Sequence, residues 1–332
     1  MKICNKCILP ETFPGINFND QGICNHCRRA DTSKTDADEI KSEYHKRLDD
    51  LINSVKGTAS YDVIMAYSGG KDSSYTLKLL RERYDLKILA FTFDNHFVSP
   101  AAWKNIDSIA DTLSVDLIKV RPPWPVINKL FNVTALDDIF PRATLLRASS
   151  ICTACIGIVK SYALKTALEM KTPLVAFGWS PGQAPIQSAI MKTNPSFVRN
   201  NQESMKKSFS PDIWPDISQF FIPDEYYEKY SEHFPVNIHP LAFFKYNEKN
   251  IMNELTKIGW CPPDDTDTNS SNCLINAFAN HCHIKRHGFH PYVWEIANMV
   301  RQGVMDRDEG MEKIYSDQNP KIVEYAKKKL GV

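Results

Sequence analysis

The chain has 332 residues, of which 43% are hydrophobic and 24% charged, and its formal net charge at pH 7 is +1. This length suits one α/β domain with appendages or two domains, and the near-neutral charge excludes the global basic field of a dedicated nucleic-acid-binding protein. We expect no membrane span and find no apolar core of a signal peptide, so a cytoplasmic protein is predicted. Nine cysteines in such a protein favour metal or redox chemistry over a disulfide framework.

The first segment, residues 1–30, carries two Cys-x-x-Cys pairs sixteen residues apart. Four thiolates at this spacing can close tetrahedrally around one Zn²⁺, and prolines and glycines between the pairs favour the turns that a zinc ribbon needs. We therefore predict a structural zinc site, whose metal replaces a hydrophobic core that so short a segment cannot build. Its ligands would be Cys4, Cys7, Cys24 and Cys27.

Residues 31–57 are charged and polar, with apolar side chains at helical spacing at Leu48, Leu51, Ile52 and Val55. This pattern predicts an amphipathic linker helix.

The next segment runs from a β-branched stretch, residues 61–66, through Gly69 and Gly70 into a helical pattern. It predicts a buried parallel strand, a tight turn and a helix N-terminus. Backbone N–H groups and the helix dipole form an anion site at such a turn, and the hydroxyls of Ser68, Ser73 and Ser74 add donors. It is not a Walker A loop, because the first glycine of that motif would fall on Met65.

Further elements of a parallel α/β sheet follow in chain order. We expect strands over 86–94, 116–120 and 173–179, a helix over 101–113, and a stiff, non-helical turn over 121–125. The loop 178–185 would lie at the carboxyl edge of the sheet, where open α/β sheets bind ligands. Residues 194–221 indicate a substrate-side insertion or lid, and 246–332 a helical cap. The histidines of that cap lack the spacing of a zinc protease, which favours surface or substrate-contact roles.

Cys152 and Cys155 stand just ahead of a predicted helix over 156–169, where the helix dipole would lower the thiol pKa. The pair alone could be a redox dithiol. With a third cysteine it becomes a three-thiolate site suited to a [4Fe–4S] cluster with one open iron. Three cysteines compete for that place, and Cys273 is favoured over Cys261 and Cys282, because the neighbouring Asn269, Ser271 and Asn272 could bind substrate or ATP.

The run Ser68–Ser74 resembles the signature of the PP-loop ATP pyrophosphatases. The resemblance implies an open parallel sheet of the adenine nucleotide alpha-hydrolase-like (HUP) type over 58–245, in which the loop holds the pyrophosphate end of ATP. It further implies that Asp72 helps to place Mg²⁺, that Lys71 offsets phosphate charge, and that Phe93 and Asp94 lie against the adenosine. In this fold, Gly178 is where the backbone passes close to the nucleotide.

Two branches of that superfamily are similar to different parts of the chain. The flanks resemble the N-acetyl sugar amidotransferases, at Cys4, Cys7, Pro14, Gly15, Ile16, Phe18, Gly22, Cys24 and Cys27, and at Glu295, Val300, Arg301, Gly303, Arg307 and Glu309. The middle resembles the tRNA thiolation enzymes that hold a [4Fe–4S] cluster by a Cys-x-x-Cys pair and a distant cysteine, matched by Cys152, Cys155 and Cys273.

Both resemblances imply transfer of AMP from ATP to a carbonyl or amide oxygen, with Asp72 and Lys71 at the phosphates. We expect sulfur to displace AMP, with Cys273 among the catalytic residues and a separate sulfur donor. The alternative is ammonia from a glutaminase partner, and a third reading is a nucleotide-binding regulator without turnover. The acceptor, a small molecule or tRNA, is not specified, and the sequence allows a homodimer without requiring one.

Overall fold

The computed structural model describes residues 1–31, 37–267 and 270–332. Its centre is a six-stranded sheet with the strand order β3-β2-β1-β4-β6-β5, in which β5 alone is antiparallel to its neighbour. The strands are β1 (Val63–Ala66), β2 (Ile88–Phe93), β3 (Asp116–Val120), β4 (Leu174–Phe177), β5 (Ile190–Lys192) and β6 (Val236–Ile238). The predicted α/β class with an open, mostly parallel sheet is confirmed, and the short antiparallel edge strand β5 was not anticipated.

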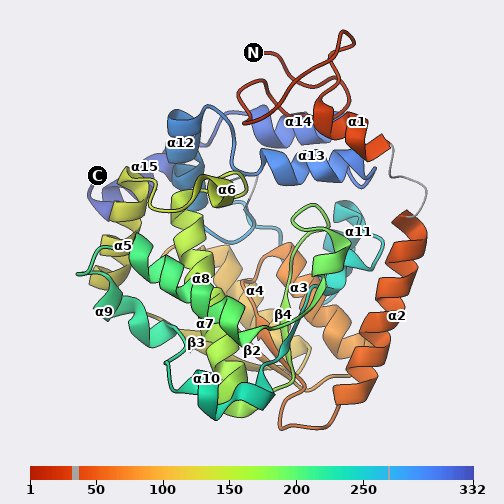
Figure 1. The fold of residues 1–332 in the computed structure, drawn as a ribbon, viewed down its shortest axis with the longest axis vertical. Helices are drawn as coiled ribbons and strands as arrows, with labels where there is room; N and C mark the ends of the chain where they lie inside the picture. Colours follow the sequence, from red (N-terminus) through yellow and green to blue (C-terminus); the bar gives the residue numbers. More distant parts are fainter. Residues whose placement is uncertain (32–36, 268–269) are drawn as a thin grey trace.

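The α-helices cover both faces of this sheet (Figure 1). They are α1 (Asn25–Asp31), α2 (Ala37–Val55), α3 (Lys71–Lys78), α4 (Pro100–Thr112), α5 (Trp124–Leu136), α6 (Arg142–Leu145), α7 (Ser150–Met170), α8 (Pro195–Ser208), α9 (Trp214–Ile217), α10 (Tyr226–Lys229), α11 (Glu248–Thr256), α12 (Asn276–His287), α13 (Val293–Arg301), α14 (Arg307–Tyr315) and α15 (Pro320–Leu330). The amphipathic helix expected in the linker is α2, whose Leu48 and Ile52 are buried in the core.

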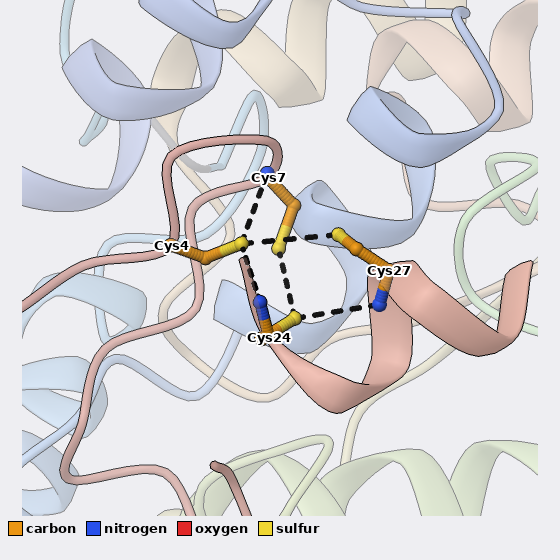
Figure 2. A group of neighbouring side chains, drawn as sticks. All are labelled: Cys4, Cys7, Cys24 and Cys27. Carbon is orange, nitrogen blue, oxygen red and sulfur yellow. Dashed lines mark hydrogen bonds between the residues drawn. The ribbon is translucent and has the colours of Figure 1, made fainter. Parts of the chain in front are cut away.

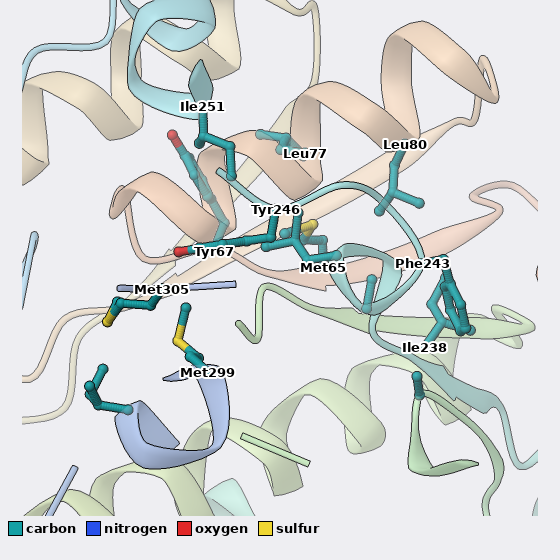
Figure 3. Close-up of a cluster of buried hydrophobic side chains, with 14 of the residues drawn as sticks. Met65, Tyr67, Leu77, Leu80, Ile238, Phe243, Tyr246, Ile251, Met299 and Met305 are labelled. Carbon is teal, nitrogen blue, oxygen red and sulfur yellow. The ribbon is translucent and has the colours of Figure 1, made fainter. Parts of the chain in front are cut away.

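Alternate residues of each central strand enter the cores on opposite sides of the sheet. In β1, Val63 and Met65 face the core shared with α3, α4 and α11, whereas Ile64 faces the core shared with α5, α7 and α15. Figure 3 shows the first of these cores, where Met65 packs among Leu77, Leu80 and Ile251. A parallel strand that is buried on both faces needs an uninterrupted apolar run, which is what this stretch of sequence provides.

Helix α7 begins earlier than expected, and helix α5 was not expected at all. Helix α7 starts at Ser150 because the Ser149 hydroxyl caps it by accepting from the Cys152 N–H, so Cys152 and Cys155 lie inside its first turns rather than ahead of them. Helix α5 starts at Trp124, within the segment expected to be non-helical, since Pro125 is tolerated in a first turn where its missing N–H has no intrahelical partner.

Helix α7 is also long and apolar enough, by length and composition, to span a membrane, which corrects the expectation that no such stretch exists. In this structure it is a core helix: it packs against β1 and β4, and 44% of its most apolar window is buried inside the protein.

The strand order places a topological switch point between β1 and β4. From β1 the chain builds outward through β2 and β3, and then returns to add β4 on the other side. Both neighbours of β1 are parallel to it, with Val63 opposite Ile88 and Leu174. Loops diverge at the carboxyl ends of such a pair, and ligands bind there in open α/β folds.

Candidate functional site

The N-terminal thiols form a compact buried group. Their sulfur atoms all lie within 4.8 Å of one another, with Cys4 and Cys27 3.9 Å apart and Cys7 and Cys24 3.8 Å apart (Figure 2). Four sulfurs at about 2.3 Å from one tetrahedral ion would stand about 3.8 Å from each other, so the donor set fits Zn²⁺ in both chemistry and spacing. Backbone N–H groups of Cys7 and Cys24 point at the Cys4 sulfur, which stabilises a thiolate.

The phosphate loop is built at the β1–α3 turn. Gly69 has a φ of +74°, and Gly70 precedes the helix with no side-chain cap of its own. The Lys71 N–H donates to Ser271, whereas the Asp72 and Ser73 N–H groups have no acceptor among the described residues and remain available to an anion. The Ser68 and Ser73 hydroxyls lie 3.0 Å apart beside them. The PP-loop resemblance thus extends from the sequence of the loop to its place in the fold.

Two glycines allow the chain to close around this loop. A Cβ on Gly178, just after β4, would stand 2.5 Å from Ser73 Cα, and a Cβ on Gly69 would stand 2.7 Å from the Ala102 carbonyl. Real Cβ atoms do not approach this closely, so the end of β4 and the loop after β1 can meet at the switch point only with glycine at these positions.

Charged groups line the loop in a connected set. Lys71 Nζ donates to Asp72 Oδ2 at 3.2 Å and lies 3.7 Å from Glu248, and the Tyr246 hydroxyl donates to Asp72 Oδ1 at 2.9 Å. Burial alone would lower the pKa of Lys71, but the neighbouring Asp72 and Glu248 carboxylates hold it well above its ordinary value. A second lysine, Lys313, reaches Glu248 at 3.2 Å. The sequence analysis did not single out Tyr246, Glu248 or Lys313, which come from the C-terminal region.

A strap over residues 270–273 joins the loop to the cysteine site. Ser271 Oγ accepts from the Lys71 N–H at 3.1 Å, and the Ser99 N–H donates to the Asn272 carbonyl at 2.9 Å. Cys273 forms an isolated bridge with Val98, just after β2. Asn269, which we expected to contact substrate or ATP, lies outside the described residues.

The structure brings Cys152, Cys155 and Cys273 to one end of the same cavity. The Asn95 side-chain amide lies 3.5 Å from the Cys155 sulfur and 3.7 Å from that of Cys273, and Asn276 Nδ2 lies 3.9 Å from that of Cys152. Burial raises the pKa of Cys155 to about 12 and of Cys273 to about 11, and raises that of Cys152. In the metal-free protein, burial therefore outweighs the helix dipole that we expected to favour thiolate.

The other two candidate cysteines lie apart from this group. Cys261 is exposed, and its backbone is held by Asn105 on α4. Cys282 is partly buried on α12, near Arg286 and Lys285, and does not line the cavity.

Most of the predicted nucleotide contacts line the cavity, but three, Gly69, Ser74 and Asp94, do not. Ser68, Gly70, Lys71, Asp72, Ser73, Phe93 and Gly178 are part of its wall. Ser74 is fully buried against the Tyr67 hydroxyl. The Asp94 carboxylate accepts from the His96 N–H and pairs with Arg121 at 3.0 Å, so it borders a separate, smaller cavity.

The main cavity encloses about 650 Å³ and is lined from both halves of the chain. Glu295 on α13 projects into it, and its carboxylate accepts from the Ser180 hydroxyl and from Gln183 Nε2 at 3.2 Å. Burial raises the pKa of Glu295 to about 7. Sequence reasoning noticed Glu295 only as part of a family-like ending, since a lone glutamate on a helix carries no signal of a titrating site.

Comparison with known proteins gives remote likenesses. No family model matches the chain. It is 22% identical over 321 residues to an uncharacterized protein of Methanocaldococcus jannaschii, covering 96% of this chain and 95% of that one. A solved structure of the U34-tRNA thiolase NcsA from Methanococcus maripaludis with its [4Fe-4S] cluster matches 100% of this chain and 88% of its own, at 16% identity and a TM-score of 0.35.

Two further solved structures are similar at the same level. A predicted subunit of tRNA methyltransferase from Methanocaldococcus jannaschii matches 70% of this chain and 90% of its own, at 17% identity and a TM-score of 0.32. The NH3-dependent NAD synthetase of Campylobacter jejuni matches 56% of this chain and 93% of its own, at 10% identity and a TM-score of 0.32. Scores this low assign neither a substrate nor a reaction.

Proposed function

We propose that this protein is a PP-loop enzyme that adenylates a carbonyl or amide oxygen with ATP, releases pyrophosphate, and then exchanges AMP for sulfur. One observation carries the proposal: the phosphate loop and three cysteines from two distant segments line the same cavity. A purely nucleotide-binding regulator has no need of thiols beside its ligand. The proposed setting is the cytoplasm, where thiols stay reduced.

ATP would lie with its β- and γ-phosphates on the loop. The Asp72 and Ser73 N–H groups at the start of α3 and the Ser68 and Ser73 hydroxyls supply donors, and Lys71 supplies the charge. Asp72 is suited to Mg²⁺, because its carboxylate faces the cavity at the first turn of α3, and Mg²⁺ is commonly held by one or two carboxylates together with phosphate oxygens.

The three-cysteine group fits a [4Fe–4S] cluster with one open iron. Its donors are soft sulfurs, they come from α7 and from the strap, and they face a cavity rather than packed protein. When bound, the cluster would supply an iron at which a sulfide from a separate donor could be held for transfer. Asn95 and Asn276 would donate hydrogen bonds to the ligating sulfurs. The N-terminal zinc would be structural.

Glu295 supplies the proton chemistry of the first step. When an amide oxygen attacks the α-phosphorus, an O–P bond forms and the bond to pyrophosphate breaks. The amide nitrogen must then lose its proton for the product to be neutral. A carboxylate whose pKa lies near 7 is matched to accept that proton at neutral pH. Ser180 and Gln183 hold the carboxylate at the cavity wall.

The proposal is tested by iron and product analysis of the anaerobically purified protein. We expect about four irons per chain with broad absorption near 400 nm, and AMP with pyrophosphate as products once an acceptor (tRNA or a small molecule) is supplied. Cys152→Ser and Cys273→Ser should lose the iron, whereas Cys282→Ser, a cysteine outside the cavity, should keep it. Asp72→Asn should fold and bind iron but release no pyrophosphate.

Two results would redirect the proposal. Protein that stays free of iron after anaerobic reconstitution, but still forms AMP, would favour the amidotransferase alternative with a glutaminase partner supplying ammonia. Cleavage of ATP to ADP would rule out adenylation under either reading.

A further inference from the structure

A lysine on the cavity wall lacks the acidic partner that the other cavity lysines have. Three lysines line the described part of the cavity: Lys71, Lys160 and Lys313. Lys71 pairs with Asp72 and Glu248, and Lys313 with Glu248. For Lys160, an exposed residue of α7, no carboxylate of the described residues lies within ion-pairing distance of Nζ.

An aromatic ring holds this ammonium instead of an acid. Lys160 Nζ lies 4.4 Å from the centroid of the Trp179 ring. Trp179 also stacks on His239, with the ring centroids 4.0 Å apart and an interplanar angle of 14°. Burial and the charge of Lys160 lower the pKa of His239 to about 3, so this ring stays neutral. A ring positions a cation without neutralising it, which leaves the ammonium donors free.

The ammonium of Lys160 is open to the cavity and has no counter-charge within ion-pairing distance among the described residues, so a ligand anion can form a charge-assisted hydrogen bond with it. The phosphates of ATP already have the loop, Lys71 and the N-terminus of α3. Lys160 lies on the face of α7 that also presents Cys152 and Cys155 to the cavity, with Ile156 and Val159 between. That wall is where an adenylated acceptor would meet its second nucleophile.

We propose that Lys160, held by Trp179, forms an anion subsite for the acceptor, and that the acceptor therefore carries a carboxylate or phosphate group beside the oxygen that is adenylated. This inference rests on the proposed function for the identity of the acceptor, but the anion subsite itself can be detected without turnover.

The experiment follows the ¹³Cε signals of labelled lysine in the full chain by NMR, with the Lys160 signal assigned from its absence in Lys160→Met. The protein is first saturated with Mg²⁺ and α,β-methylene-ATP, which cannot release pyrophosphate, and inorganic phosphate or acetate is then added. We expect the Lys160 signal to shift saturably on addition of the small anion. The control is Lys165→Met, which removes another lysine of α7 whose ammonium donates to the Gln219 carbonyl. This variant should behave like the unmodified protein.

Three results would overturn the subsite. The nucleotide analogue alone could move the Lys160 signal to its end point, which would assign the anion to ATP. The signal could stay still in every addition. Lys160→Met could also weaken ATP binding tenfold or more, where we expect less than a twofold change. Lys160→Arg, which keeps the charge, should retain phosphate binding and so separates loss of the anion site from misfolding. Failure of every acceptor to elicit pyrophosphate would count against the proposed function and leave the NMR result standing.

Discussion

The charge state of each titratable side chain at this site depends on its burial and on the charged groups that lie next to it. Burial raises the pKa of Glu295 to about 7 from an ordinary 4.5 and the Asp72 carboxylate adds to the rise, while the hydrogen bonds from Ser180 and Gln183 offset part of it. Lys71, on the wall of the same cavity, pairs with two carboxylates and stays charged. The two groups therefore divide the work: Lys71 keeps a fixed charge, and Glu295 exchanges a proton.

Replacing Glu295 by Gln should separate these roles. Between pH 4.5 and 7 the folded protein keeps a proton that the unfolded chain releases, so the stability of the unmodified protein falls as the pH rises through this range. At pH 8, Glu295→Gln should therefore have an unfolding free energy about 1–3 kcal/mol higher than that of the unmodified protein. Denaturant unfolding of both proteins at pH 8 and at pH 4.5 measures this difference. Pyrophosphate release should fall by roughly 10²-fold or more and lose its rise through pH 7.

The matched control is Glu312→Gln, which changes an exposed glutamate on α14. It should leave the stability difference and the pH profile unchanged. A Glu295→Gln protein with an unaltered pH–rate profile would remove Glu295 from the proton step.

Among the elements, the contact between the end of β4 and the start of α3 decides the shape of the phosphate loop. Gly178→Ala would force a Cβ to within 2.5–2.9 Å of the Asp72–Ser73 backbone, which cannot move without distorting the loop. We expect a loss of about 1–3 kcal/mol in unfolding free energy and at least tenfold weaker ATP binding in calorimetry. Gly157→Ala on α7 is the comparison, because its Cβ would meet only the flexible end of Met205. Equal ATP affinity in both variants would contradict this account.

Strands β1, β2 and β4 could be predicted closely because their apolar runs are uninterrupted and both of their faces are buried, whereas the short, exposed edge strand β5 gives no such signal. The phosphate loop and the cysteine pairs could be predicted because their residue types and spacing are specific to a chemistry. The first residues of the helices were harder to predict from the sequence, because the Ser149 cap of α7 and the tolerance of α5 for Pro125 depend on local geometry. The roles of Tyr246, Glu248 and Lys160 depend on contacts between residues far apart in sequence, for which one chain gives no periodic signal.

At the scale of the whole molecule, the N-terminal segment packs on the helix that carries Glu295. Phe13 stacks on Trp294 at 5.5 Å and 9°, and Arg307 on the neighbouring helix α14 donates to the backbone carbonyls of Cys7 and Cys4. Figure 1 shows α1 beside α13 and α14. The four thiols therefore do more than close residues 1–31: they fix the surface against which α13 is packed.

Removal of one thiol of this N-terminal group should lower both the stability of the protein and the activity at the cavity. Cys24→Ser should lose about one metal ion per chain and lower the unfolding free energy by roughly 3 kcal/mol or more, because metal binding by the four thiolates contributes directly to the folding free energy of the segment. Zinc analysis and thermal denaturation measure both effects. Pyrophosphate release should fall as well, since Trp294 adjoins Glu295. If Cys24→Ser kept its metal and stability, the four-thiolate site would be disproved.

Helix α7 also acts as a ruler. Lys160 comes five positions after Cys155 in this helix. At a rise of about 1.5 Å per residue, the Cα atoms of the two residues are therefore about 7.5 Å apart along the helix axis. An acceptor that reaches both groups would therefore extend along the cavity wall from the cysteines toward Trp179, and its charged group would lie within reach of the Lys160 side chain.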